Sequence, residues 1–443
     1  MIMQAKFEPT IIILSAGNGE RMNSSTPKVL HEVAQQALIK YVLELSGKVN
    51  SGCANAHIVI NRELEGNKQF QEICKQYQVK TIIQQERLGT GDAVKTACDS
   101  IDALRDLVLI LYGDTPFIKP SSINAMAEQI EKGADIVIIG FNAQNPTGYG
   151  RIVSTDGNRV EAIVEENETT EVQKSIRLCN SGILLVKKDV LLDFLVNAKY
   201  NRDKEFYLTD IVGCTKNKIC TYIVADEEEV MGINDRKQLY VAEKYMQKVI
   251  VEKMIELGGT IIKPETSYFA ADILISRDVV IYPNVFIGKD TVIKSHARIH
   301  SFSHIEGGCI DEHAIIGPFA RIRPNTQIGS KSKIGNFVEV KNSTIMEGVK
   351  AGHLSYIGDA TIDNDVNIGA GTVFCNYDGS KKHHSKVGEK SFIGSNTSII
   401  SPVIIKNKAT IAAGSVITKD VDENDLAVAR ARQLNIKNKS KIK

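Results

Sequence analysis

ISRDVVIYPNVFIGKDTVI, at Ile275–Ile293, is the stretch that decides the fold of the C-terminal half. An aliphatic residue returns at every sixth position, and the period continues to Ile417 with one-residue slips and a longer step from Phe374 to Val387. A six-residue period is typical of a parallel β-helix, in which each unit is one short strand and a bend, and three units make a coil. A helix, with a period of 3.6 residues, or an alternating strand, with a period of two, would not keep this frame.

Burial of the repeated aliphatic side chains explains why the repeats fold together. Coils stacked at strand spacing, about 4.8 Å, place the sixth-position residues in one continuous internal column. Each Ile or Val buried there stabilises the fold by roughly 1.5–3 kcal/mol. One coil cannot cover its own apolar face, so the stacked coils must fold together as one unit. We therefore predict a left-handed parallel β-helix over residues 260–430.

The composition is that of a globular protein with more than one core. A chain of 443 residues is too long for a single core, so two domains are expected. Its 43% hydrophobic and 24% charged residues are ordinary for such proteins. A formal net charge of +1 gives no reason to expect nucleic acid or an anionic membrane as a partner. No apolar run reaches the roughly 20 residues that a membrane helix needs.

Cysteine usage and the N-terminus indicate the cytoplasm. The eight cysteines are scattered, without a CxxC pair or the spacing of a disulfide scaffold, which is typical of reduced thiols. The first apolar run, Ile11–Leu14, is only strand-length and leads directly into a functional-looking loop, so it is no signal peptide. We expect a cytoplasmic protein with small-molecule substrates, no nucleic-acid partner and no membrane insertion.

The N-terminal half has a different pattern. Up to about residue 230, short aliphatic runs such as Leu107–Leu111 alternate with amphipathic stretches. This alternation predicts an α/β domain of Rossmann-like architecture, with a mostly parallel, doubly wound sheet. The next segment reads as one helix that ends at a glycine pair. The predicted division is an α/β domain at 1–234, a linker helix at 235–259, a β-helix at 260–430 and a basic tail at 431–443.

A glycine turn follows the first predicted strand. The segment LSAGNGERM, Leu14–Met22, is followed by PKVLH, Pro27–His31. Backbone N–H groups exposed in such a turn bind phosphate, and Arg21 and Lys28 would add positive charge. The turn lacks the third glycine of the dinucleotide fingerprint and the GK[ST] of a P-loop, so neither a dehydrogenase nor a kinase-type NTPase is favoured. Taken alone, the segment fits a tight turn with solvated charges equally well.

Further motifs give the chain a resemblance to a known family. In chain order they are QQERLGTGDA (Gln84–Ala93), YGD (Tyr112–Asp114), PTGYGR (Pro146–Arg151), IVEE (Ile163–Glu166), CNSGI (Cys179–Ile183), EFYLTD (Glu205–Asp210) and GINDR (Gly232–Arg236). With the glycine turn and the hexapeptide repeats, they cover nearly the whole chain. The sequence resembles the nucleoside-diphosphate-sugar pyrophosphorylases. It is most similar in its motifs to the bifunctional N-acetylglucosamine-1-phosphate uridylyltransferase and glucosamine-1-phosphate N-acetyltransferase family of bacterial cell-wall synthesis.

The resemblance implies uridylyl transfer in the N-terminal domain, where a sugar-1-phosphate oxygen attacks the α-phosphorus of UTP and pyrophosphate leaves. Charge grows on the bridging and leaving oxygens, so the reaction needs positioning and cations. By resemblance, Asp114 and Asn234 hold Mg²⁺, while Arg21 and Lys28 act in catalysis by neutralising the triphosphate. The residues implied to bind UTP or the UDP-sugar are Leu14, Ala16, Gly17, Lys28, Gln84, Gly89, Thr90, Tyr112, Gly113, Asp114, Gly150, Glu165, Asn180 and Asn234.

Some of these positions have simpler explanations, and two depart from the family pattern. Asp114 follows a predicted strand, where aspartate often caps a turn, and Asn234 fits the N-cap of the linker helix. Glu20 stands where the family usually has a small hydroxyl residue, and its carboxylate would repel a triphosphate unless it points away or meets Arg21 or Mg²⁺. Gln35–Gln36 replaces a usual Gly-Lys pair.

The repeat region contains the residues of the family's second reaction where the six-residue pattern is interrupted. By resemblance, acetyl-CoA donates its acetyl group to the amine of glucosamine-1-phosphate, and this amine must lose a proton as it attacks. A histidine titrates near neutral pH and suits a general base, and the resemblance selects His353. It assigns to the sugar phosphate Arg323, Lys341, Tyr356, Asn367 and Lys382, and to acetyl-CoA Ala370, Asn376, Tyr377, Ser395, Ala413 and Arg430. For Ser395 and Ala413, tight packing between coils explains the small side chains equally well.

Two other functions share parts of this pattern. Some hexapeptide proteins are carbonic anhydrases with three histidines on a zinc ion between subunits, but no local histidine triplet here has a known zinc spacing. In a related type of nucleotidyltransferase the β-helix serves only for assembly or allosteric binding. Such a protein would lack His353, Tyr356, Asn376 and Tyr377 in register. The resemblance also implies a homotrimer, and the flat coils that a monomer would expose favour association.

Overall fold

The computed structural model describes residues 7–155, 158–197, 205–214 and 218–439 of the chain. It divides into two compact units, residues 1–245 and 246–443, and each is described by itself. The division lies within helix α9, Arg236–Glu256. The domain boundaries that the sequence places on either side of this helix stay a prediction.

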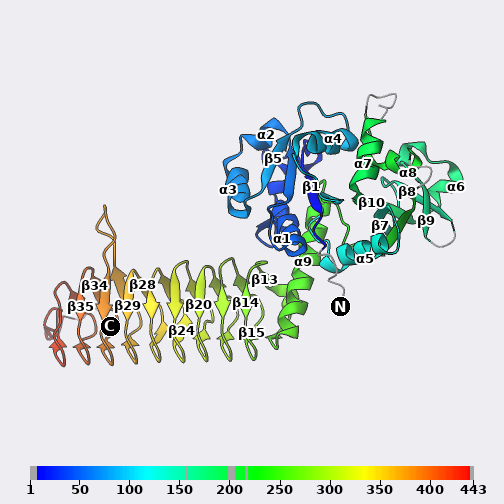
Figure 1. Cartoon of the computed structure of the whole chain (residues 1–443). Helices are drawn as coiled ribbons and strands as arrows, with labels where there is room; N and C mark the ends of the chain where they lie inside the picture. Colours follow the sequence, from blue (N-terminus) through cyan, green and yellow to red (C-terminus); the bar gives the residue numbers. More distant parts are fainter. Residues whose placement is uncertain (1–6, 156–157, 198–204, 215–217, 440–443) are drawn as a thin grey trace, which may run out of the picture. The chain divides into compact units, whose positions relative to one another are not determined.

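The first unit is built on a mixed sheet with nine strands among the described residues (Figure 1). Its strands β1, β4, β5 and β6 are parallel, and β11 is parallel to β7. Across the sheet they are β5 (Lys80–Ile83), β4 (Ala56–Ile60), β1 (Thr10–Leu14), β6 (Leu107–Tyr112), β10 (Leu178–Lys187), β7 (Ile136–Asn142), β11 (Cys220–Ala225), β9 (Arg159–Val164) and β8 (Arg151–Thr155).

Helices cover both faces of this sheet, because successive residues of a strand point to opposite faces. Ile11 and Ile13 of β1 pack on one side with α1 (Leu38–Asn50), and Ile12 and Leu14 pack on the other side. The helices of the first face are completed by α3 (Lys68–Tyr77) and α5 (Pro120–Glu131), and those of the second by α4 (Thr90–Ser100), α7 (Lys188–Val196) and α8 (Ile211–Cys214). The predicted doubly wound α/β fold is confirmed.

The prediction of a mostly parallel sheet misses one strand at the centre. β10 runs antiparallel to both β6 and β7, and β8 and β9 form an antiparallel hairpin. An aliphatic run shows that a strand is buried on both faces, but it does not show the direction of that strand. The smaller elements of this unit are β2 (Glu32–Val33), β3 (Gln36–Ala37), α2 (Arg62–Glu65), α6 (Glu171–Lys174), η1 (Glu20–Met22), η2 (Lys28–Leu30), η3 (Glu166–Glu168) and η4 (Leu208–Asp210).

The order of the strands creates a binding position at the carboxyl ends of β1 and β6. From β1 the chain continues to β4 on one side, and later reaches β6 on the other side of β1. In open α/β sheets, the crevice at such a switch point is where ligands bind. The loops that enter this crevice begin at Ser15 and Gly113, immediately after the two strands.

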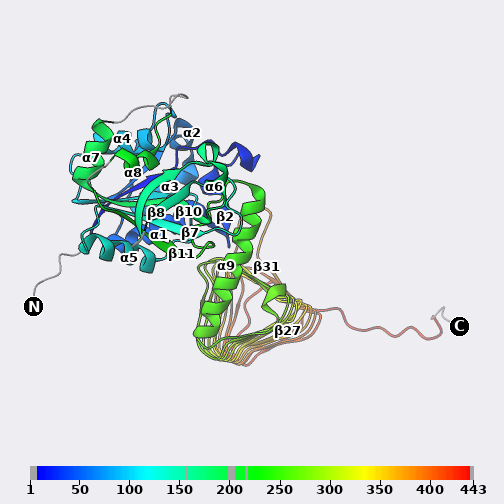
Figure 2. The ribbon, with the colours of Figure 1, turned by 90° about the vertical axis from the view of Figure 1, so that its right-hand side faces the viewer.

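The second unit is a parallel β-helix, as the six-residue period predicts. Three parallel sheets form its sides, and Figure 2 shows the triangular outline of the stack. Ile275 pairs with Ile293, 18 residues later, and Ile293 pairs with Ile310 after a coil of 17 residues. The slips in the sequence pattern are therefore coils shortened by one residue, and the inward column continues through them.

The strands of the β-helix are two to four residues long. In one sheet lie β12 (Thr260–Ile261), β15 (Val280–Ile281), β18 (Arg298–Ile299), β21 (Ile315–Ile316), β24 (Lys333–Asn336), β27 (Lys350–His353), β30 (Asn367–Ile368), β33 (Phe392–Ile393), β36 (Thr410–Ile411) and β38 (Leu426–Ala427). In the second lie β13 (Tyr268–Phe269), β16 (Phe286–Ile287), β19 (His304–Ile305), β22 (Arg321–Ile322), β25 (Glu339–Lys341), β28 (Tyr356–Gly358), β31 (Val373–Cys375), β34 (Ser398–Ile400) and β37 (Val416–Ile417). In the third lie β14 (Leu274–Ile275), β17 (Val292–Ile293), β20 (Gly308–Ile310), β23 (Thr326–Ile328), β26 (Thr344–Ile345), β29 (Ala360–Ile362), β32 (Ser385–Val387) and β35 (Ile404–Ile405).

One coil of the stack is interrupted by a projecting loop between β31 and β32. Ile362 pairs with Val387, so this coil is longer than its neighbours by about the length of the loop. The loop narrows at an antiparallel bridge between Tyr377 and Lys382, and it projects from the stack in Figure 1. The longer step in the sequence period therefore marks a loop that leaves the β-helix.

Neighbouring residues of β35 provide a direct test of the inward column. Ile405 is 0% exposed and Ile404 is 49% exposed. We expect Ile405→Ala to reduce the free energy of unfolding by about 2–5 kcal/mol, because it removes buried methyl groups and leaves a cavity. Ile404→Ala, the matched control, should cost less than about 1 kcal/mol. Denaturant unfolding of both variants measures the difference, and equal losses would contradict the assigned register.

Candidate active sites

A cavity of about 530 Å³ opens at the carboxyl ends of β1 and β6. It is lined by residues from eight of the motifs that the sequence singles out. Of the predicted ligands, it gathers Leu14, Ala16, Gly17, Lys28, Gln84, Gly89, Thr90, Tyr112, Asp114 and Asn234. Segments far apart in sequence therefore meet at one position, at the switch point of the sheet.

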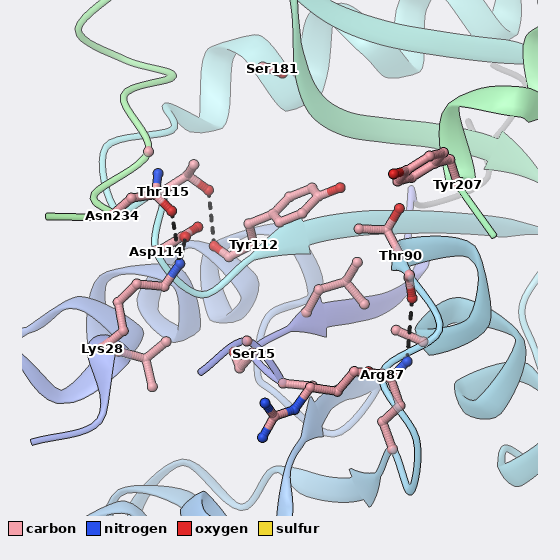
Figure 3. A pocket seen from close by; sticks show the side chains of 18 of the residues that line it. Ser15, Lys28, Arg87, Thr90, Tyr112, Asp114, Thr115, Ser181, Tyr207 and Asn234 are labelled. Atoms are coloured by element: carbon pink, nitrogen blue, oxygen red, sulfur yellow. Dashed lines mark hydrogen bonds and ion pairs between the residues drawn. The ribbon is translucent and has the colours of Figure 1, made fainter. Parts of the chain in front are cut away.

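The positively charged Lys28 side chain lies between the two proposed metal ligands, Asp114 and Asn234. The Lys28 ammonium group donates to Asp114 Oδ2, and it lies 3.1 Å from Asn234 Oδ1 (Figure 3). The side chains of Lys28 and Asp114 are 15% and 14% exposed. A carboxylate oxygen and an amide oxygen that converge on one positive charge are ligands of the kind that Mg²⁺ takes. The donor set therefore fits a divalent cation, for which the ammonium group stands in.

Backbone contacts hold Asn234 beside Asp114. Ile233 N donates to Asp114 O at 2.9 Å, which joins the two loops directly. The N-cap of α9 is Asp235, because Gln238 N donates to Asp235 Oδ1 at 2.8 Å. The simpler explanation for Asn234, capping of the linker helix, is therefore wrong. The Asn234 side chain faces Lys28 instead.

The opposite end of the cavity is formed by two motifs that bind each other. Phe206 N donates to Leu88 O at 2.6 Å, and Gly91 N donates to Phe206 O at 2.9 Å. The amide nitrogen of Gln84 donates to Asp92 Oδ2 at 2.8 Å and to Gly89 O at 3.3 Å. Both amide hydrogens of Gln84 are thereby used, and its orientation is fixed.

Gly89 has no room for a side chain. Its φ is +103°, and a Cβ atom would lie 2.4 Å from the carbonyl oxygen of Phe206. We expect Gly89→Ala to raise, at least tenfold, the KM for the nucleotide substrate that the sequence motifs predict, because the two motifs must separate and Gln84 moves with them. Gly133→Ala is the matched control, since φ is +104° there and nothing lies within 4 Å. Steady-state kinetics of both variants measure the effect. If Gly133→Ala raised KM as much as Gly89→Ala does, backbone strain at positive φ, and not the contact with Phe206, would explain the rise.

The predicted sugar ligands lie next to the cavity lining. Asn180 N donates to Gly150 O at 2.8 Å, and a Cβ at Gly150 would lie 3.4 Å from Glu165 Oε2. Thr209 Oγ1 donates to Glu165 Oε1 at 3.0 Å, and burial raises the pKa of Glu165. The cavity itself is lined by their chain neighbours Tyr149 and Ser181. Gly150, Glu165 and Asn180 thus form a second layer behind the lining.

Tyr112 lies close enough to Asp114 and Glu165 to feel the charges of both, and Gly113 stands between Tyr112 and Asp114 in the chain. Burial, and then the charges of Asp114 and Glu165, raise the pKa of Tyr112 far above its ordinary value, so the phenol stays neutral. A Cβ at Gly113 would lie 2.3 Å from Ser15 Oγ. Gly113 therefore allows the loops after β1 and β6 to approach closely, although it does not itself line the cavity.

The structure places Arg21 and Glu20 outside the cavity lining. Both side chains are exposed in the short helix η1. Asn18 Nδ2 donates to Glu20 Oε1 at 3.2 Å. Gln35, the other departure, adopts φ +61° in the turn between β2 and β3, a conformation that glycine takes at lower cost.

Sequence reasoning missed several residues that line this cavity: Ser15, Val29, Arg87, Ala93, Thr115, Tyr149, Ser181, Glu205, Tyr207, Val230 and Gly232. Most of them stand inside or beside the motifs already quoted, so position within a motif was the available signal. The Arg87 side chain extends from its loop toward Ser15 in Figure 3.

In the β-helix, His353 is held by the coil before it. Asn336 and His353 are register partners in β24 and β27, and His353 Nδ1 lies 2.6 Å from Asn336 Oδ1. An amide oxygen only accepts hydrogen bonds, so Nδ1 carries a proton, and in the neutral imidazole Nε2 then has the lone pair. Sequence reasoning missed Asn336, whose one signal is its distance of one coil from His353.

Three of the predicted acetyl-CoA residues, Ala370, Ser395 and Ala413, continue the column that starts with Asn336 and His353. Each follows an inward residue of the same sheet by two positions, so one residue from every coil stands at the same corner. The members are Asn336, His353, Ala370, Ser395 and Ala413, and Arg430 Nη1 donates to Ala413 O at 2.7 Å. Ser395 and Ala413 are exposed, so packing between coils does not explain their small side chains.

Three predicted phosphate ligands gather at another corner. Arg323 and Lys341 follow inward residues of consecutive coils, and the projecting loop brings Lys382 to them. The contact with Lys382, and then the charge of Arg323, lower the pKa of Lys341. Arg323 Nη1 also lies 2.8 Å from Glu339 Oε1. Like charges held this close are a site for an anion.

The remaining predicted residues lie around the base of the projecting loop or in the neighbouring sheet. Asn376 Nδ2 lies 3.5 Å from the Tyr356 hydroxyl, and Gly358 leaves room for both side chains. Tyr377 is exposed in the loop, and its hydroxyl donates to Gly379 O at 2.6 Å. Asn367 stands in β30, next to Lys350 of the preceding coil.

Among residues 7–155, 158–197, 205–214 and 218–439, no three His, Cys, Asp or Glu side chains are grouped to hold a metal ion. None of the helices in these ranges has the length and apolar character to cross a bilayer.

The fold and the two sites define a nucleotidyltransferase joined to a hexapeptide-repeat transferase. Family models agree: residues 11–173 match the MobA-like NTP transferase domain, 304–378 the GMPPB C-terminal domain, and 384–419 the bacterial transferase hexapeptide with six repeats.

Curated relatives match along both units. "Bifunctional protein GlmU" of Bartonella quintana (strain Toulouse) is 42% identical over 432 residues, which are 96% of this chain and 95% of the relative. The proteins of the same name from Wolbachia pipientis wMel and Zymomonas mobilis are 41% and 39% identical over 431 residues; each match covers 96% of this chain, and 97% and 95% of the relative. The chain belongs to the GlmU family of bifunctional proteins.

Proposed function

We propose that the protein makes UDP-N-acetylglucosamine in two reactions. The β-helix transfers the acetyl group of acetyl-CoA to glucosamine-1-phosphate, and the α/β unit then joins the product to UMP from UTP and releases pyrophosphate. The observation that carries this proposal is the presence of both sites in one chain: a cation between Asp114 and Asn234, and an imidazole with a free lone pair at His353.

In uridylyl transfer, the protein supplies position and charge. The carbonyl oxygen of the fixed Gln84 amide would accept from the imide N–H of uracil, and Gly89 and Thr90 would supply the donor for a uracil carbonyl. The backbone of Ala16 and Gly17 would bind phosphate at the end of β1. Lys28 would hold the phosphates while the sugar-1-phosphate oxygen attacks in line, and no covalent intermediate is required.

Asp114 and Asn234 are the proposed ligands of Mg²⁺, because their oxygens already converge on one cation. When bound, this ion would neutralise the charge that develops on the phosphate oxygens. Glu20 does not prevent this arrangement, since its exposed carboxylate contacts Asn18 outside the cavity lining. For Arg21, which is also outside the lining, a catalytic role requires its short helix to move toward the triphosphate.

In acetyl transfer, Nε2 of His353 would accept the proton that the substrate amine loses as it attacks the thioester. The amine nitrogen becomes an amide, the carbon–sulfur bond breaks, and the CoA thiolate leaves. Arg323, Lys341 and Lys382 would bind the sugar phosphate as a bidentate guanidinium and two ammonium groups. The column from His353 to Ala413 runs roughly 14 Å at strand spacing, which suits the long, thin arm of CoA.

A homotrimer in the cytoplasm is the proposed state of the protein. Phe302, Phe319 and Phe337 are exposed and stack along one edge of the β-helix, with ring centroids 4.9 and 5.2 Å apart. Phe337 immediately follows Asn336, so this apolar edge runs beside the His353 column. A contiguous apolar edge of this kind is typical of a protein–protein contact. Light scattering on the purified protein measures the mass and tests the trimer.

The test of the proposed function is one assay with two readouts. Purified protein receives glucosamine-1-phosphate, acetyl-CoA, UTP and Mg²⁺, and free thiol and pyrophosphate are followed separately. Thiol release, with pyrophosphate that depends on prior acetylation, is the expected result. Pyrophosphate without thiol would reduce the β-helix to a scaffold. Thiol without pyrophosphate, even with N-acetylglucosamine-1-phosphate supplied, would indicate a different nucleotide.

A further inference from the structure

One buried carboxylate, Asp359, fastens the base of the projecting loop to the β-helix. Asp359 is 6% exposed. Asn376 Nδ2, from the loop, donates to Asp359 Oδ2, and Asn342 Nδ2, from the coil below, donates to Oδ1. Its backbone is bound on both sides, since Asp359 N donates to Lys341 O at 3.1 Å and Ser385 N donates to Asp359 O at 3.2 Å. The residue therefore joins the two ends of the loop to the coil that contains Lys341.

Within the part of the chain that the structure describes, no cation forms a direct ion pair with the Asp359 carboxylate, although cations lie close to it. A buried carboxylate is costly unless hydrogen bonds satisfy its oxygens, and two neutral amides do so here. Its charge raises the pKa of Lys341, against the larger lowering caused by Lys382 and Arg323. Asp359 thus offsets part of the repulsion among three like charges that would otherwise move apart.

Beyond its base, the loop is internally braced. Asp378 Oδ1 accepts from Ser380 N at 2.7 Å and Lys381 N at 2.6 Å, and His383 Nε2 lies 2.6 Å from Asp378 Oδ2. His383 N also donates to Asn376 O at 2.8 Å. These hydrogen bonds hold the part of the loop that carries Lys382 in a fixed position relative to Asn376. The contact of Asn376 with the coil therefore sets the position of the whole loop.

We propose that Asp359 is a positioning residue for acetyl transfer. It holds Asn376 beside Tyr356 and orients the loop so that Lys382 completes the cationic site of Arg323 and Lys341. This role depends on the proposed acetyltransferase function of the β-helix. The sequence motifs did not identify Asp359, because it meets Asn376 only when the coils of the β-helix are stacked in register.

The test compares two Asp→Asn variants. Asp359 has φ +50°, a conformation that Asn adopts readily, so Asp359→Asn keeps the backbone, replaces one of the two acceptor oxygens with an amide donor and removes the charge. We expect the KM for glucosamine-1-phosphate to rise at least tenfold, with a smaller change in kcat and with uridylyl transfer unchanged. Asp365→Asn is the matched control, since Asp365 is an exposed corner residue with φ +56°. Its kinetics should equal those of the wild type.

A double-mutant cycle with Lys382→Ala separates positioning from general destabilisation. If Asp359 acts through the loop, Lys382→Ala should cost less than threefold in the Asp359→Asn background, far less than in the wild type. Fully additive losses, or an unchanged KM in Asp359→Asn, would overturn the proposal. If Asp359→Asn loses its cooperative thermal transition, Asn376→Ala removes the same contact from the loop side and should give the same rise in KM. A wild-type enzyme that releases no thiol would contradict the acetyltransferase function itself.

Discussion

Asp114→Ala is expected to reduce uridylyl transfer about a thousandfold while acetyl transfer continues at the wild-type rate. The variant removes the carboxylate that meets the Lys28 ammonium group and that we propose as a Mg²⁺ ligand. Charge stabilisation of this kind contributes several kcal/mol to a phosphoryl-transfer barrier, and about 4 kcal/mol corresponds to a thousandfold change in rate. Pyrophosphate release with N-acetylglucosamine-1-phosphate and UTP measures the loss, and thiol release in the same sample reports on the β-helix.

Asp106→Ala is the control at the other end of the same strand. Asp106 precedes β6 and its side chain is fully exposed, whereas Asp114 follows β6 and lines the cavity. Both reactions should keep their wild-type rates in Asp106→Ala. Loss of both reactions in a folded Asp114→Ala protein would show that the two sites are not independent. An active Asp114→Ala variant would remove Asp114 from the proposed metal site.

His353→Ala is expected to have the reverse effect. Acetyl transfer should fall by about 10²–10⁴-fold, the usual contribution of a general base, and uridylyl transfer should not change. The physical reason is that no other group in the column has a lone pair suited to accept the amine proton: Ala370 and Ala413 have none, and Ser395 is a poor base. Thiol release with glucosamine-1-phosphate and acetyl-CoA measures the loss.

Two further variants test whether the imidazole acts through its orientation. Asn336→Ala removes the hydrogen bond to Nδ1 and should slow acetyl transfer by about five- to tenfold, because such a bond contributes about 1 kcal/mol. His313→Ala, which removes an exposed histidine stacked on His296 at another corner, should have no effect. An inactive His313→Ala protein would show that histidine loss harms the fold, and the result for His353 would then say nothing about a base.

The inward column was predictable because one physical requirement, burial, repeats at every coil. Ile275 and Ile405 follow the same rule although they lie at opposite ends of the stack. The antiparallel direction of β10 was not predictable, since Leu184 and Val186 are buried in the same way whichever direction the strand takes. The local hydrophobic pattern shows which residues are buried. The direction of a strand depends instead on how the chain connects it to its neighbours, which the pattern does not show.

Among the residues proposed for the two sites, the sequence motifs identified those that stand inside a motif. They missed those whose hydrogen-bond partner lies one coil away. The resemblance placed Lys28, Asp114 and Asn234 among the ligands, and the structure brings them together in one cavity. Asn336 and Asp359 were not found, because each meets its partner from 17 residues away, and that distance has meaning only once the register is known. The roles of all these residues stay predictions, and Arg21, Gly150, Glu165 and Asn180 do not line the cavity.

The column of residues from Asn336 to Ala413 determines how the length of this corner of the β-helix can change in evolution. It takes one residue from each coil, and each coil adds about 4.8 Å. Copying or losing one coil of 17 or 18 residues would therefore lengthen or shorten the column by one step and leave every other coil in register. If acetyl-CoA lies along this column, as we propose, an acyl donor with a longer or shorter arm would require a different number of coils, while the histidine and its neighbours keep their places.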